Sequence, residues 1–131
     1  MPRRPDYDGF VDWLRESFDD DLRWTASFDH ETFDYDVHHV RQDLKTELTG
    51  HQLDTIIHRS IALFNRDRVD DVYFHLGDAE ALVAQHERAV AVHLYLDAER
   101  AVVVMLEKGA EVTLPTFPAE CLERLGVEAD G

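Results

Sequence analysis

The stretch EALVAQHERAVAVHLYLDAERAVVVMLE, from Glu80 to Glu107, decides the fold of this chain. Apolar side chains occupy every second position in two of its runs, Val90 to Leu96 and Val102 to Leu106. Charged residues at 87–88 and 97–100 separate the runs. Period-two alternation between polar turns is typical of antiparallel hairpins. The stretch therefore predicts a three-stranded meander on which the other segments pack.

The composition indicates one domain of ordinary size. The chain has 131 residues, of which 44% are hydrophobic, enough for a core without metal or disulfide. The single cysteine, Cys121, has no partner for an internal disulfide, and no apolar run reaches the ~18 residues of a membrane helix. We expect one domain over residues 1–131, with residues 1–5 as a disordered tail, in a cytoplasmic protein without a membrane partner.

The charge is strongly acidic. The chain has 28 acidic and 13 basic residues, a net charge of −15, and its only lysines are Lys45 and Lys108. Such repulsion is screened near 1 M salt, where the Debye length falls to ~3 Å. The evenly spread acids therefore predict a protein of a halophilic cytoplasm; the alternative is an acidic surface for a basic partner. Nucleic acid is excluded as a partner, because phosphate binding requires clustered Lys and Arg.

The N-terminal third predicts a helix and two strands. Phe10, Trp13, Leu14 and Phe18 form a helical stripe, with Asp8 as the expected N-cap and 19–21 as the end. Alternation over 22–28 predicts a strand that is buried on one face only. A second strand over 33–40 places His38 and His39 on opposite faces, with Val40 on the face of His38.

The middle of the chain predicts a long helix. The sequence TGHQ at 49–52 has the form of a capping box, and an apolar stripe follows to Phe64. His51, Asp54 and His58 lie off this stripe, and we expect the two histidines to be solvated. Segments 41–48 and 69–77 stay ambiguous, the first between helical turn and loop and the second between strand and connection.

The last segments predict a further strand and a helix. We expect a strand over 79–86, with a short helix as the alternative. Pro118 is placed as at the first position of a terminal helix that Gly126 ends. Cys121 lies on the apolar stripe of this helix, where burial makes a thiol inert.

The resulting order of elements is helix, strand, strand, helix, three strands, helix. It predicts an α+β protein, a layered α/β sandwich with a five-stranded antiparallel sheet and helices packed on it. This order is similar to the roadblock and longin-like, profilin-like scaffolds; PAS and GAF sensor domains are the neighbouring alternatives. The stretches DVHHVRQDL (36–44), GDAEALVAQHERAVAVHL (77–94) and ECLERL (120–125) resemble a family of small proteins from halophilic archaea, over about residues 22–125. The resemblance implies no activity for any residue.

Signatures of enzymes are absent from the sequence. The six glycines are far apart, which excludes a dinucleotide fingerprint, a P-loop and a nucleophile elbow. We therefore expect no catalytic residue and no cofactor. The candidates for a metal site are His30, Asp34, Asp36 and His38, close in sequence but without a recognised ligand spacing; the alternative is that they are exposed polar residues.

The sequence favours a non-enzymatic interaction or regulatory module. Roadblock-like scaffolds pair through a sheet edge and the long central helix, so the resemblance implies a homodimer, with an unidentified protein as a possible further partner. If the strand over 79–86 lies at the sheet edge, Leu82, Val83 and Ala84 are the expected interface residues. The alternatives are a PAS- or GAF-like small-molecule sensor and a His/Asp metal-binding protein.

Overall fold

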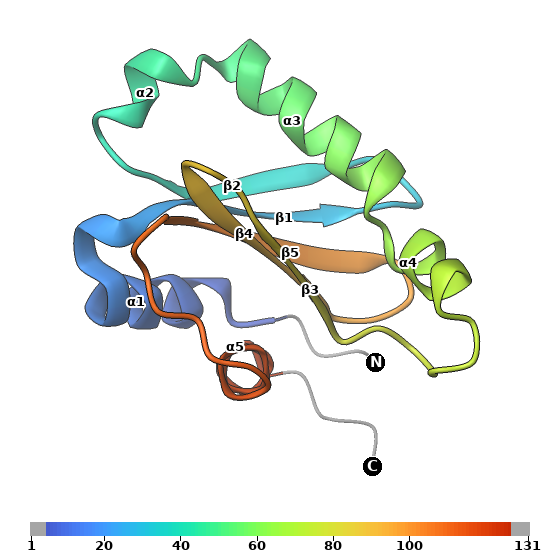
Figure 1. Cartoon of the computed structure of the whole chain (residues 1–131). Helices are drawn as coiled ribbons and strands as arrows, with labels where there is room; N and C mark the ends of the chain where they lie inside the picture. The colour runs from blue at the N-terminus through green and yellow to red at the C-terminus, as the bar shows by residue number, and fades with distance from the viewer. Residues whose placement is uncertain (1–4, 127–131) are drawn as a thin grey trace.

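A five-stranded antiparallel sheet forms the centre of the molecule (Figure 1). The computed structural model describes residues 5–126. The strand order across the sheet is β2-β1-β5-β4-β3. The strands are β1 (Leu22–Asp29), β2 (Tyr35–Val40), β3 (Ala81–Gln85), β4 (Ala89–Tyr95) and β5 (Arg100–Glu107). The predicted α+β fold class and the meander, now β3-β4-β5, are confirmed.

Helices cover both faces of the sheet, which makes the molecule a three-layer sandwich (Figure 1). α1 (Tyr7–Phe18) and α5 (Thr116–Arg124) lie on one face, and α3 (Gly50–Leu63), preceded by the short α2 (Leu44–Glu47), lies on the other. The 3₁₀ turn η1 (Asp19–Asp21) links α1 to β1, and α4 (Arg66–Val72) follows α3.

The core therefore has two halves, and the central strands are buried on both faces. Val92 and Val104 pack against α1 and α5, whereas Val103 packs against α3. The expectation that β1 is buried on one face only was wrong. Thr25 and Ser27 are buried as well, because α1 covers that face, and Thr25 Oγ1 donates a 2.8 Å hydrogen bond to the Val103 carbonyl.

A bulge in β2 overturns the predicted alternation of its side chains. β1 pairs Thr25 with His39 but the next residue, Ala26, with Val37, so His38 is the extra residue. His38 stacks on Tyr7 of α1, whereas Val40 packs in the core half under α3. The two residues expected on one face thus lie on opposite faces, because a bulge resets the period-two pattern.

Helix ends follow local capping chemistry. Thr49 and Gln52 form the predicted capping box of α3. Two predicted ends were wrong by a few residues. Asp6, not Asp8, caps α1, since its side chain accepts from the Gly9 amide, and α5 begins at Thr116, before Pro118.

The two ambiguous segments are helical or turn-like. The segment 41–48 contains α2, and 69–77 contains the end of α4 followed by a turn, in which the Leu76 amide donates to the Tyr73 carbonyl. The strand alternative for 72–76 was therefore wrong. Asp70 helps to fix the connection between α4 and β3, since its side chain accepts a hydrogen bond from the Ala79 amide.

Candidate interaction surface

Strand β3 forms one edge of the sheet, as the sequence predicts. It pairs with β4 in a regular register over all five residues, without a bulge. The amide of His86 bonds to the Ala89 carbonyl and the amide of Tyr95 to the Glu80 carbonyl, so the even-numbered residues of β3 point their backbone groups at β4. Backbone groups of the odd-numbered residues, Val83 among them, point out from the sheet.

The predicted interface residues lie half-buried on this strand. Leu82 packs on the α3 side of the core and Val83 on the α1 side, and Ala84 lies between Val83 and the exposed Gln85. No residue between 81 and 85 carries a charge. Among residues 5–126 no strand pairs with the outer side of β3, and an apolar edge with unpaired backbone groups is a template for strand addition.

The opposite edge, β2, is less suited to pairing. Its bulge interrupts the row of backbone groups, and Asp36 and the two histidines place polar side chains along it. Bulges and charges are the devices by which proteins blunt sheet edges. Of the two edges, β3 is therefore the one prepared for a partner.

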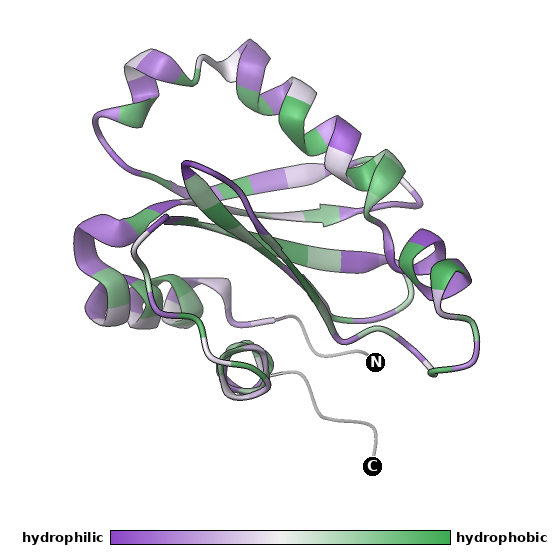
Figure 2. Cartoon of the chain, viewed as in Figure 1, coloured by the Kyte–Doolittle hydropathy of each residue, from purple (hydrophilic) through white to green (hydrophobic). Residues whose placement is uncertain are grey.

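Large apolar side chains are exposed beside the start of β3. We name the residues that end α4 and form the following turn the apolar tip: Val72, Tyr73, Phe74 and Leu76, with Phe74 84% exposed. Leu63 and Phe64 at the end of α3 are exposed as well, and Figure 2 shows hydrophobic residues there and on α4. Scattered exposed apolar residues need no explanation, but a cluster indicates an interaction surface. The pattern of the sequence did not predict this cluster, although the apolar run at 72–76 was the available signal.

Polar contacts fix the base of the apolar tip. Asp70 Oδ1 accepts a 2.7 Å hydrogen bond from the Ala79 amide, and Arg66 Nη2 lies 3.2 Å from Asp78 Oδ2. These contacts join α4 to the residues just before β3. The two ends of the turn that carries the apolar tip are thus held together.

The four metal candidates do not converge. His30 Nε2 lies 3.6 Å from Asp67, whereas His38 Nε2 lies 2.8 Å from Ser27 Oγ and its ring stacks on Tyr7. Asp34 and Asp36 both line a groove of about 230 Å³. Within residues 5–126, no group of three or more His, Cys, Asp and Glu side chains is arranged to hold a metal ion.

Asp54 and His58 on α3 contact each other, and Asp54 also contacts β2; the His58 side chain is 46% exposed, in line with the expected solvated position. The hydroxyl of Tyr35 donates a 2.7 Å hydrogen bond to Asp54, which lies 3.3 Å from His58 Nδ1. The hydrogen bond with Asp54 raises the pKa of Tyr35, and burial raises it further. These contacts fasten β2 to α3, and only the tertiary structure brings their residues together.

Cys121 is buried on α5, as the sequence predicts for this thiol. Burial raises the pKa of its thiol far above the ordinary value, and the nearby carboxylate of Glu120 adds to the shift. A protonated, enclosed thiol is a poor nucleophile. The described part of the chain also contains no helix long and apolar enough to cross a membrane.

Comparison with known families covers nearly the whole chain. Residues 8–126, from α1 to the glycine after α5, match a domain of unknown function, DUF7522. The chain belongs to this family. Comparison with curated proteins gives no match.

Solved structures of roadblock proteins have the same fold. The gliding protein MglB from Thermus thermophilus is 16% identical, with a TM-score of 0.60 over 91% of this chain and 87% of that one. MglB from Myxococcus xanthus is 6% identical, with a TM-score of 0.58 over 95% and 90%. A Roadblock/LC7 domain from Streptomyces avermitilis is 12% identical, with a TM-score of 0.52 over 80% and 77%. The predicted roadblock-like layout is thus confirmed.

Proposed function

We propose that this DUF7522 protein is a non-enzymatic interaction module that acts as a homodimer, paired through β3 of two copies. The observation that carries the proposal is the regular, uncharged and unpaired edge of β3 beside the exposed apolar tip. One solved MglB structure is described as having a tetrameric arrangement, which supports self-association of this scaffold. The regulatory role and a further protein partner rest on the likeness to roadblock folds.

Antiparallel pairing across a two-fold axis suits this edge. The outward backbone groups of one β3 are self-complementary to those of the other, which is what a two-fold interface requires. Leu82 packs on the α3 side of the sheet, so two paired edges would continue one apolar surface under both α3 helices. The apolar tip, next to the start of each β3, would lie beside the end of the partner's strand.

The charge of the chain sets the condition for pairing. Two copies of net charge −15 repel each other. Because the segment 81–85 has no charged side chain, this repulsion acts between charges that lie away from the paired strands. Long-range repulsion is screened at molar salt, where the Debye length is ~3 Å. We therefore expect the dimer to tighten as salt rises.

Proline substitution at Val83 tests the pairing with little damage to the fold. The Val83 amide points away from β4, so Val83→Pro removes a donor to a second copy but no hydrogen bond within the sheet. Val37→Pro is the matched control, because Val37 likewise lies between the hydrogen-bonded positions of its edge strand, β2.

Light scattering at ~0.1 mM protein and ~2 M KCl gives the readout, at a salt concentration that screens the repulsion. We expect a dimer for the wild type and for Val37→Pro, and a monomer with an unchanged circular dichroism spectrum for Val83→Pro. A monomeric wild type would refute the proposal. A dimer that survives Val83→Pro but is lost in Val37→Pro would move the interface to β2.

A further inference from the structure

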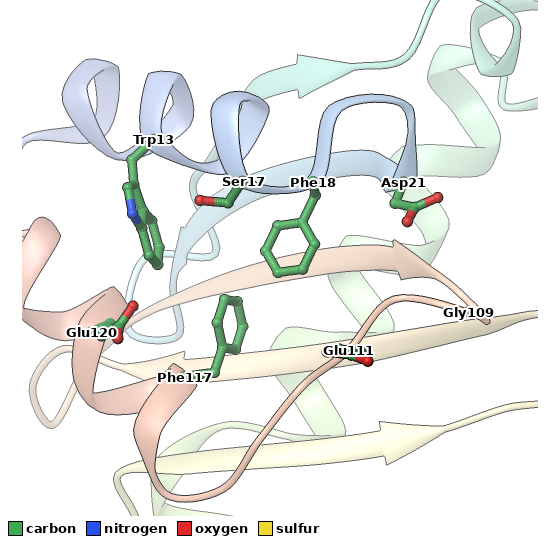
Figure 3. A pocket seen from close by; sticks show the side chains of 8 residues that line it. All are labelled: Trp13, Ser17, Phe18, Asp21, Gly109, Glu111, Phe117 and Glu120. Atoms are coloured by element: carbon green, nitrogen blue, oxygen red, sulfur yellow. The ribbon is translucent and has the colours of Figure 1, made fainter.

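A second surface, on the opposite side of the molecule from α3, has the chemistry of a cation-binding site. A groove of about 400 Å³ lies between α1, the segment after β5 and α5 (Figure 3). Three aromatic rings, from Trp13, Phe18 and Phe117, line it. Phe18 and Phe117 point towards each other in Figure 3, with ring centroids 5.4 Å apart and planes at 89°.

Carboxylates surround this aromatic floor. Asp21 comes from η1, Glu111 from the segment after β5 and Glu120 from α5, and no Lys, Arg or His side chain lines the groove. Among residues 5–126, none of the three carboxylates forms a side-chain hydrogen bond or ion pair. Three segments distant in sequence thus place carboxylates beside one aromatic surface.

The chain itself places a cation against one of these rings. The guanidinium carbon of Arg124 lies 5.4 Å from the centroid of the Trp13 ring, within the ~6 Å range of a cation–π contact. Among residues 5–126, Arg124 forms no ion pair with the three groove carboxylates, although it lies one helical turn after Glu120 on α5. The negative faces of aromatic rings and the carboxylates attract the same kind of ligand.

We propose that the groove binds a small organic cation of the alkylated ammonium class. The methyl groups of such a cation pack on Trp13, Phe18 and Phe117, while its charge lies among the three carboxylates. A quaternary ammonium ion is weakly hydrated, so it loses little hydration free energy on entering an aromatic site. Quaternary ammonium ions are the ligand class that aromatic cages recognise. A potassium ion is more strongly hydrated, so it gains less binding free energy from the rings.

Nuclear magnetic resonance with choline as the probe tests this proposal. The chain has two tryptophans, Trp13 in the groove and Trp24 buried under α3, so the Trp24 indole signal is an internal control. At constant ~1 M KCl, choline should shift the Trp13 indole signal saturably, with a dissociation constant of about 1–10 mM. The neutral carbon isostere of choline, dimethylbutanol, should bind at least about tenfold more weakly.

Charge-neutral variants locate the site. The double variant Glu111→Gln, Glu120→Gln should weaken choline binding at least about tenfold, since it removes two of the three charges. The control Glu123→Gln, an exposed residue of α5 outside the groove, should bind like the wild type. Absence of saturation, equal binding of the neutral isostere, or unchanged affinity in the double variant would each overturn the proposal. None of these outcomes depends on the dimer, because β3 contributes no residue to the groove.

Discussion

Replacement of His93 tests how burial of an ionisable group makes folding depend on pH. His93 lies on β4 between Leu82 of β3 and Val103 of β5, with 3% of its surface exposed. Its Nδ1 atom has no hydrogen-bond partner in the structure. Burial lowers the pKa of His93 from 6.5 to about 4, so the folded protein holds this imidazole neutral.

The magnitude follows from the difference between the two pKa values. An unfolded chain with a His93 pKa of 6.5 takes up a proton between pH 6.5 and 4, and the folded chain does not, so the free energy of unfolding falls as the pH falls through this window. A pKa that falls from 6.5 in the unfolded chain to about 4 in the folded chain is equivalent to a loss of about 3 kcal/mol in the free energy of unfolding below pH 4. Between pH 7 and pH 5, this one group lowers the free energy of unfolding by about 2 kcal/mol.

Urea unfolding of His93→Leu isolates this contribution. At pH 7 the variant should be at least as stable as the wild type, because it removes a buried polar atom without a partner. Between pH 7 and pH 5, at equal protein concentration and molar KCl, the wild type should lose about 2 kcal/mol more than the variant. The control His86→Gln, at an exposed position, should follow the wild type. Parallel losses in the wild type and His93→Leu would refute the reasoning.

Three further measurements test the charge and polar contacts. The melting temperature should rise as KCl increases from ~0.1 to ~2 M, because salt screens the repulsion among charges that sum to −15; a flat or falling value in thermal melts would instead favour an acidic surface for a basic partner. Zinc or calcium should leave the melting temperature unchanged; a rise that disappears in the Asp36→Ala, His38→Ala double variant would locate a metal site there. Glu107 lies 2.9 Å from Arg23 and 2.8 Å from Arg41. Glu107→Gln should therefore lower the free energy of unfolding in urea by about 1–3 kcal/mol. An unchanged free energy would show that these ion pairs are energetically neutral.

The candidate interaction surface was only partly predictable from the sequence. The uncharged run at 81–85 and its place at the start of the meander predicted an edge strand, because hairpins along the chain leave the first strand with one neighbour. The apolar tip was not predicted, since a run such as Val72 to Leu76 normally indicates burial. In the structure the turn lies outside the core, and the Asp70 and Arg66 contacts join its two ends. The aromatic groove likewise joins side chains from α1 and α5, at opposite ends of the chain.

The sequence by itself determined the features that neighbouring residues encode. Period-two alternation predicted two of the three strands of the meander, and the Thr49 to Gln52 capping box placed the start of α3, because hairpins and caps depend on residues only a few positions apart. Only the tertiary structure decided that β1 lies beside β5, that both faces of β1 are buried and that β2 contains a bulge. Those features rest on contacts such as Thr25 to Val103, 78 residues apart, where packing of distant segments overrides the local pattern.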